Sequence, residues 1–215
     1  MDRQRRVVRE LLDAHGRTYA DEAGIRLRDT PQPLYRLLVL AHLLSARIRA
    51  SVALATARAL HEAGLRDPRR MAEAGWQERV DALGRGGYRR YDERTATQLG
   101  EAAELLNERW GGDLRRLRRE ADGKVSGLRH LLQEFPGIGP AGADIFLREA
   151  QGVWPEAAPY LDAKALQGAE RLNLPKDTER LVELAGDTDP AVLAAALVRA
   201  AVDKDVAEDA MRRAG

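Results

Sequence analysis

The sequence predicts an all-α fold, and three observations support this prediction. Apolar residues recur at the spacing of helix faces through most of the 215 residues, beginning with Val7, Val8, Leu11 and Leu12. No stretch alternates apolar and polar residues with a period of two over any length, so strands are not expected. Hydrophobic residues make up 44% of the chain and charged residues 32%, the balance of a globular protein rather than a disordered one.

The expected helices alternate with breaks that contain glycine or proline. A first helix at 3–14 is followed by a loop rich in Asp, Gly and Pro that runs to Pro33. Residues 34–46 are apolar nearly all round, which predicts a buried helix, and 50–63 form an amphipathic one. Further helices are expected at 68–73, 76–83, 92–110 and 113–117, in a hairpin pair at about 127–149, and in the alanine- and leucine-rich segments 162–173, 177–185 and 189–214.

Capping residues mark some of these boundaries. Asp67 can cap the helix at 68–73, with Pro68 in its first turn. Glycines break the chain at 84–87, and Gly111 with Gly112 ends the helix at 92–110. The helix limits are therefore predicted by local sequence as well as by periodicity.

The most specific local feature is a glycine turn at 135–143, Phe-Pro-Gly-Ile-Gly-Pro-Ala-Gly-Ala. Gly137 and Gly139 permit backbone conformations and close approaches that other residues forbid. Two helices joined by such a turn can direct the unpaired N–H groups at the start of the second helix toward an anion, typically a phosphate. The turn predicts a clamp for the DNA backbone.

Charge is unevenly distributed, although the formal net charge is only +1. Residues 47–129 contain 18 basic and 13 acidic side chains, and residues 177–215 contain five basic and nine acidic ones. A basic middle and an acidic tail fit a half that faces nucleic acid and a half that faces solvent. Solvated helix faces that are merely unbalanced would give the same pattern.

The chain has no cysteine, which excludes disulfides, thiolate metal sites and cysteine-ligated iron–sulfur clusters. No two of its four histidines stand at metal-ligand spacing with a third partner, so they are interpreted as packing or surface residues. No run of 18 apolar residues is present, and no membrane association is expected. We expect a cytoplasmic, nucleoid-associated protein without a cofactor.

Four motifs follow one another between 43 and 162. They are Leu-Leu-Ser-Ala-Arg at 43–47, Gly-Gly-Tyr-Arg-Arg-Tyr at 86–91, Phe-Pro-Gly-Ile-Gly at 135–139 and Tyr-Leu-Asp at 160–162. In this order and near this spacing, they resemble the endonuclease III superfamily of helix-hairpin-helix (HhH-GPD) base-excision DNA glycosylases. The resemblance covers about residues 33–175 and identifies a divergent member without the iron–sulfur cluster.

The resemblance implies a two-lobed all-α fold. A six-helix barrel lobe would occupy 31–149, with the helix-hairpin-helix at about 127–149, and a second lobe would combine 1–30 with 150–215. Double-stranded DNA with a lesion or mismatch would be the partner of a monomeric chain. The target base would be flipped out, because its glycosidic carbon cannot be reached inside a stacked duplex.

The resemblance also implies the residues of the site. Asp162 would stabilise the sugar cation and orient or deprotonate water, although it could equally be only a helix N-cap. Family hairpins can hold Na⁺ or K⁺, here through the carbonyls of Gln133, Phe135 and Ile138. The DNA-binding residues would be Arg47, Tyr88, Arg89, Gly137, Ile138, Gly139 and Ala141, and the base-pocket residues Tyr91, Trp154 and Tyr160. These aromatic residues could instead belong to the core.

The departures from the family pattern bear on mechanism. Ala141 stands where bifunctional members carry a nucleophilic lysine, so β-lyase activity by that route is not expected. Lys164 stands where the family has a histidine, and it is either an alternative nucleophile or a solvated or ion-paired lysine. Arg47 replaces a glutamine that fills the gap left by the flipped base, or is a surface arginine. Extra length at 153–160 could reshape the pocket.

Three functions remain open from the sequence. The first is a monofunctional DNA glycosylase that removes a damaged or mispaired base by hydrolysis. The second is a DNA-binding or damage-sensing protein that has kept the fold and lost the chemistry. The third is an abasic-site lyase that uses Lys164.

Overall fold

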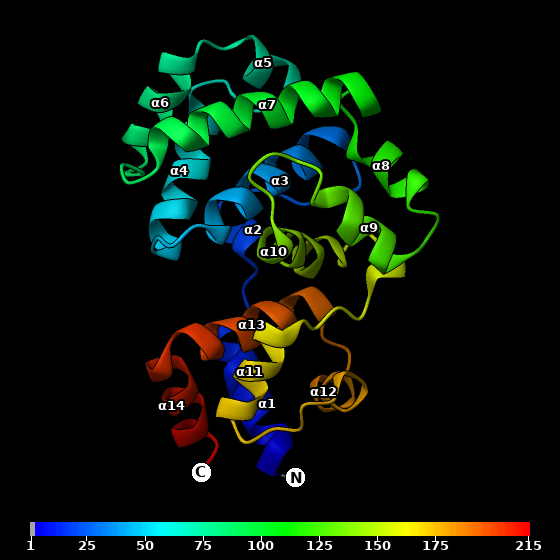
Figure 1. Cartoon of the computed structure of the whole chain (residues 1–215). Helices are drawn as coiled ribbons and strands as arrows, with labels where there is room; N and C mark the ends of the chain where they lie inside the picture. The colour runs from blue at the N-terminus through cyan, green and yellow to red at the C-terminus, as the bar shows by residue number, and fades with distance from the viewer. Residues whose placement is uncertain (1–2) are drawn as a thin grey trace. The chain divides into compact units, whose positions relative to one another are not determined.

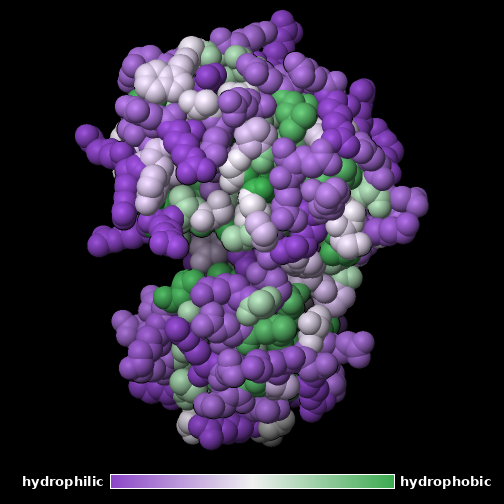
Figure 2. All heavy atoms as spheres, in the orientation of Figure 1, coloured by the Kyte–Doolittle hydropathy of each residue, from purple (hydrophilic) through white to green (hydrophobic). Residues whose placement is uncertain are grey.

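The computed structural model describes residues 3–215 and is helical throughout, with no strand in that range. Fourteen α-helices and one 3₁₀-helix are present in the described residues (Figure 1). The predicted all-α fold is therefore confirmed. None of the described helices is long and apolar enough to cross a membrane, and hydrophilic residues cover most of the face drawn in Figure 2.

The chain divides into two compact units. The contiguous unit comprises residues 20–146, and the two-segment unit combines 1–19 with 147–215. One boundary falls within the helix Tyr19–Glu22 and the other within the helix Pro140–Ala150. We predicted residues 20–30 in the second lobe and 147–149 in the barrel lobe, but the structure places 20–30 in the contiguous unit and 147–149 in the two-segment unit. The physical reason is packing: Ile25 is buried beside Tyr35, and Arg58 Nη1 donates to the Glu22 carbonyl over 2.6 Å.

The contiguous unit is built around the apolar helix α3, in which nine of the fifteen residues are buried. Helix α7 packs against α5 and α6 (Figure 1). As predicted, the Asp67 side chain caps α5 by accepting from the Arg70 amide at 2.9 Å. The helices are α2 (Tyr19–Glu22), α3 (Pro31–Ser45), α4 (Ala50–Glu62), α5 (Pro68–Glu73), α6 (Trp76–Arg85), α7 (Asp92–Trp110), α8 (Leu114–Glu120), α9 (Val125–Leu132) and α10 (Pro140–Ala150), which continues into the other unit.

The two-segment unit centres on helix α13, which packs against α11. Gly168 permits this approach, because a Cβ atom there would lie 1.8 Å from the Leu197 carbonyl oxygen. The helices are α1 (Arg3–His15), the end of α10, the 3₁₀-helix η1 (Pro155–Ala157), α11 (Ala163–Arg171), α12 (Thr178–Ala185), α13 (Pro190–Val202) and α14 (Lys204–Arg213).

Two predicted segments were wrong. The helix expected at 189–214 is two helices, because Asp203 has an extended backbone that ends α13, and its carboxylate caps α14 through the Asp205 amide at 2.9 Å. The loop expected before Pro33 contains the short helix α2. The helix α2 has only four residues, too few to show an apolar periodicity. The break at Asp203 changes the periodicity around it little, so sequence pattern alone missed both features.

Candidate nucleic-acid interface and candidate active site

The glycine turn connects α9 to α10 and is anchored by apolar contacts. Phe135 and Ile138 are buried, and the Ile138 amide donates to the Phe135 carbonyl over 3.0 Å. The Phe135 ring packs on Trp110 with 5.4 Å between centroids. Gly137 has φ +82°, the left-handed conformation that favours glycine. The turn is therefore held by its own apolar side chains, with Phe135 packed on the last residue of α7.

The outer side of the turn is open. Gly139 and Ala141 are exposed, and a Cβ atom at Gly139 would meet no atom within 4 Å. Within residues 3–215, neither the Gly139 nor the Ala141 amide donates to a backbone carbonyl. These free N–H groups at the start of α10 have the geometry that suits an anion.

The inner side of the turn rests on a buried histidine that sequence reasoning treated as a packing or surface residue. A Cβ atom at Gly137 would lie 2.2 Å from His42 Cε1 and 2.9 Å from Gln98 Oε1. Burial lowers the pKa of His42 to about 4; the Gln98 hydrogen bond raises it and the charge of Arg94 lowers it. A neutral imidazole therefore fills the space under Gly137, and no side chain larger than hydrogen fits there.

Four arginines surround a second feature of the contiguous unit, which we call the four-arginine depression. It has a volume of about 610 Å³ and joins the loop after α3 to the turn between α6 and α7. Its lining comprises Arg47, Ile48, Arg49, Val52, Gly87, Tyr88, Arg89 and Arg90. The structure thus brings together Arg47, Tyr88 and Arg89, which the sequence predicted as DNA-binding residues.

The four arginines of the depression are exposed and, among the described residues, form no ion pair. The guanidinium of Arg90 instead makes a cation–π contact, because it lies 5.3 Å from the centroid of the Tyr91 ring. Tyr91 is 39% exposed. The depression therefore concentrates uncompensated positive charge around a partly apolar floor, an arrangement suited to phosphate.

Tyr88 lines the depression but is nearly buried. It is 2% exposed, and its hydroxyl lies 3.1 Å from Thr95 Oγ1. Burial raises the pKa of the Tyr88 phenol, while the Thr95 hydrogen bond lowers it. Its side chain belongs to the core, so of the predicted pair Tyr88 and Arg89 only the arginine presents its side chain to a ligand.

Asp162 lies in the two-segment unit, where it caps α11 and is held by a buried arginine. Its Oδ1 accepts from the Ala165 amide at 3.2 Å. Arg148 Nη1 donates to Oδ1 at 2.9 Å and to Oδ2 at 2.8 Å, and the side chains of Arg148 and Asp162 are 9% and 11% exposed. The N-cap that we considered from sequence is confirmed. Sequence reasoning missed Arg148, although a lone arginine after the apolar pair Phe146 and Leu147 was an available signal.

Gln151 fixes the loop that precedes Asp162. Its Nε2 donates to the Arg148 carbonyl at 2.8 Å and to the Tyr160 carbonyl at 3.1 Å, and its Oε1 accepts from the Tyr160 amide at 2.7 Å. Gln151 is 3% exposed. The side-chain amide thus pairs with Tyr160 as a backbone strand would, and it ties the returning loop to the end of α10.

The remaining predicted residues have less prominent settings. Trp154 has no exposed surface, so its ring cannot stack on a base in this structure, and we correct its assignment to the base pocket. Lys164 is exposed, and its Nζ lies 2.9 Å from Gln167 Oε1. Tyr160 is partly buried. The described residues contain no group of three or more His, Cys, Asp or Glu that could hold a metal ion.

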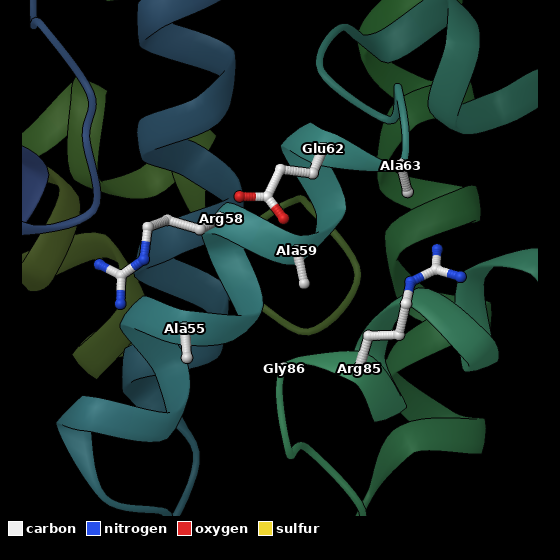
Figure 3. A pocket seen from close by; sticks show the side chains of 7 residues that line it. All are labelled: Ala55, Arg58, Ala59, Glu62, Ala63, Arg85 and Gly86. Carbon is white, nitrogen blue, oxygen red and sulfur yellow. The ribbon is translucent and has the colours of Figure 1, made fainter.

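A further hollow of about 580 Å³ lies between α4 and the end of α6 (Figure 3). Small residues form much of its lining, with Arg58, Glu62 and Arg85 around them. Its two arginines and one carboxylate give it mixed charge, and the Arg58 guanidinium already donates to the Glu22 carbonyl. The hollow therefore indicates no particular class of ligand.

The all-helical fold with its glycine hairpin is similar to the fold of endonuclease III. Two solved structures of endonuclease III with DNA are among those that the chain resembles. A trapped endonuclease III–DNA covalent intermediate, an estranged-adenine complex, aligns with a TM-score of 0.53 and 16% identity. A non-covalent endonuclease III–DNA complex aligns with a TM-score of 0.56 and 15% identity, and each alignment covers 93% of this chain and 85% of the other. No family model and no curated protein matches the sequence.

Proposed function

We propose that this chain is a base-excision DNA glycosylase that binds double-stranded DNA and hydrolyses the N-glycosidic bond of a flipped, damaged or mispaired base. The observation that carries the proposal is the open amide turn at Gly139, found in the same unit as the four-arginine depression and within the endonuclease III fold. Both features suit phosphate, and the structural neighbours are complexes with DNA.

The interface chemistry follows from the two features. The amides of Gly139 and Ala141 would donate to one phosphate at the start of α10, where the helix dipole also favours negative charge. The guanidinium groups of the depression would contact further phosphates in bidentate fashion. These contacts position the duplex without reading its sequence. The identity of the base would then depend on the pocket that receives it.

The proposed chemistry rests on Asp162. Departure of the base leaves positive charge on the sugar, and a fixed carboxylate stabilises such an oxocarbenium-like state. Arg148 and the Ala165 amide hold the Asp162 carboxylate in place. We therefore assign Asp162 mainly to electrostatic stabilisation of the cation and to orientation of the attacking water.

Strand cleavage is not part of the proposal. Ala141 provides no amine at the place where the resemblance puts the lysine of bifunctional relatives. Lys164 points to Gln167, and no observation favours it as a nucleophile. The product would be an abasic site in intact DNA, released by a monomer without a cofactor. A structural Na⁺ or K⁺ at the hairpin carbonyls belongs to the same proposal.

One observation favours a second candidate, a damage-sensing protein that binds DNA without excision. The Arg148 guanidinium neutralises the Asp162 carboxylate in the buried pair, and this reduces the net charge available to stabilise a cation. Both candidates predict DNA binding, and they differ in base release.

The test is an assay of wild type and Asp162→Asn on duplexes that each carry one lesion or mismatch. We expect the wild type to release a base without nicking the strand. Asp162→Asn should lower the release rate by about 100-fold or more while sparing affinity, because the lost interaction acts mainly in the transition state. Retained turnover in Asp162→Asn would refute the site assignment.

The other functions give different results in the same assay. Tight binding of a damaged duplex with no release by the wild type would support the damage sensor. A borohydride-trapped complex with DNA that disappears in Lys164→Ala would support the lyase. Absence of any preference for damaged duplex would exclude all three.

A further inference from the structure

The proposed function does not explain why the arginine that holds Asp162 is buried. We infer that Arg148 is a positioning residue, which fixes the Asp162 carboxylate for its part in base excision; this inference rests on the proposed function. Arg148 lies in the last turn of α10, and Asp162 stands at the start of α11. The pair joins two helices of the same unit.

The geometry fixes both oxygens of the carboxylate. One guanidinium nitrogen, Arg148 Nη1, donates to Oδ1 and Oδ2 within 0.1 Å of the same distance, at 2.9 and 2.8 Å. The Ala165 amide supplies a third donor to Oδ1 at 3.2 Å. A carboxylate bound from two directions can rotate little about its χ angles. Its negative charge therefore occupies one place before any substrate arrives.

The backbone of Asp162 is fixed as well. Gln151 lies three residues after Arg148 in sequence and pairs with both the amide and the carbonyl of Tyr160, two residues before Asp162. The same Gln151 side chain donates to the Arg148 carbonyl. The end of α10 thus holds the side chain of Asp162 through Arg148 and its preceding backbone through Gln151.

Helix capping alone does not account for Arg148. Five other aspartates cap helices of the described chain: Asp67, Asp113, Asp177, Asp189 and Asp203. Where such a cap pairs with arginine, the arginine is solvated: Arg70 beside Asp67 is 55% exposed, and Arg115 beside Asp113 is 38% exposed. Among these caps only Asp162 has an arginine that is 9% exposed. Desolvation of a charged pair is costly and is not needed to cap a helix.

Preorganisation explains what the buried arginine contributes. A carboxylate that must reorient during the reaction loses part of its stabilisation of the cation, and a misplacement of about 1 Å can lower a rate about 100-fold. Arg148 also supplies a compensating positive charge beside the Asp162 carboxylate, where little solvent is present. Arg148 would act through Asp162 and would not itself contact DNA.

The experiment is a double-mutant cycle between Arg148→Met and Asp162→Asn, with Arg148→Lys as the conservative variant. The rate of base release is measured in single turnover on the duplex that the wild type processes, and affinity is measured on the same duplex with a tetrahydrofuran abasic analogue. Circular dichroism and a thermal melt of each variant report folding.

We expect Arg148→Met to release base about 10- to 100-fold more slowly than wild type with affinity unchanged within about twofold. Arg148→Lys should be slower than wild type but keep at least about a third of its rate, because it retains the charge and one donor. In the Asp162→Asn background, Arg148→Met should cause no further loss. If Arg148→Met does not fold, a rate for Arg148→Lys between those of wild type and Asp162→Asn, with unchanged affinity, supports the inference.

Other results overturn it. An Arg148→Met or Arg148→Lys protein that folds and works at or above the wild-type rate shows that Arg148 does not position Asp162. An equal loss in both backgrounds shows that Arg148 acts elsewhere. If the wild type releases no base from any duplex, the proposed function fails and the inference fails with it. Release by the wild type with no effect of Arg148→Met makes the inference alone fail.

Discussion

The arginines of the two units differ in what surrounds them. In the contiguous unit, the arginines of the four-arginine depression are exposed and have no carboxylate partner among the described residues. In the two-segment unit, Arg148 is nearly buried and holds both oxygens of Asp162. The same side chain is therefore available to a ligand in one place and committed to the protein in the other. The role of each arginine is therefore indicated by whether a carboxylate of the protein contacts it, and not by its being an arginine.

Ordinary surface arginines in this chain give a useful reference. Arg69, for example, pairs with Glu73 at 2.8 Å, and their side chains are 83% and 63% exposed. Exposed pairs of this kind contribute little to stability, about 0–1 kcal/mol. Against this background, four neighbouring arginines without such partners stand out as a surface that attracts an external anion.

The largest expected effect comes from removing the charge of the depression. Changing Arg47, Arg49, Arg89 and Arg90 together to Gln should weaken binding to duplex DNA by about two to three orders of magnitude at low salt. The slope of log affinity against log salt should fall by about one for each lost phosphate contact. The unfolding free energy should change by less than about 1 kcal/mol, since these side chains are exposed. Fluorescence anisotropy over a salt series measures both quantities.

The matched control removes a paired arginine from the same unit. Arg69→Gln deletes an equal charge per substitution, but this side chain is 83% exposed and bound to Glu73. It should leave affinity within about twofold, because its charge is already compensated. Equal losses per charge at both places would mean that overall charge, and not the depression, determines binding.

The second prediction concerns the turn that holds the free amides. Gly137→Ala should lower the unfolding free energy by about 2–4 kcal/mol, since φ is +82° and the new Cβ would lie 2.2 Å from His42 Cε1. Gly139→Ala is the control, because its Cβ would meet nothing within 4 Å. Its stability should stay unchanged or rise by less than about 1 kcal/mol. Urea titration of both variants measures the difference, and similar losses would contradict the packing of the turn on His42.

The third prediction follows from the neutral imidazole under the turn. The pKa of His42 in the folded protein is about 4, below its ordinary value of 6.5, so the unfolded chain takes up the proton first as the pH falls. The stabilisation from keeping His42 neutral is present above about pH 6.5 and is lost as the pH falls toward 4. Between pH 7 and pH 5 the loss should be about 2 kcal/mol.

His42→Gln separates this contribution from other acidic effects. The variant has no titratable group at 42, so its unfolding free energy should fall less steeply between pH 7 and pH 5 than that of the wild type. Urea titrations at several pH values measure the two slopes. Parallel pH dependences would show that His42 is not the group that titrates.

Much of the fold could be predicted because its signals are local. Apolar periodicity predicted the buried helix α3, and a favoured cap residue with a following proline predicted the start of α5. The break at Asp203 was missed, because a single capping aspartate inside an alanine-rich stretch changes the periodicity little. At Asp203 neither a glycine nor a proline accompanies the cap, whereas Pro68 follows the cap of α5.

The site was only partly predictable because its key contacts join distant positions. The hairpin and Asp162 were found by motif, yet the partners His42 and Arg148 depend on which helices pack together. Burial also separated residues that look alike in sequence: Trp154 has no exposed surface, whereas Tyr91 is 39% exposed. Sequence reasoning could name candidate aromatic residues for the base pocket, but only packing could tell which of them face outward.

The smallest effect is expected from changing Lys164. This lysine extends the comparison between cationic side chains that pair within the protein and those that are open to a ligand. Lys164 is exposed and its Nζ donates to the neutral Gln167 Oε1, so it is neither buried like Arg148 nor grouped like the arginines of the depression. Lys164→Ala should change the unfolding free energy by less than about 0.5 kcal/mol and leave the rate of base release within about twofold. Thermal melts and single-turnover assays measure these. A large loss of release with normal affinity would place an amine in the reaction and would favour the lyase over hydrolysis.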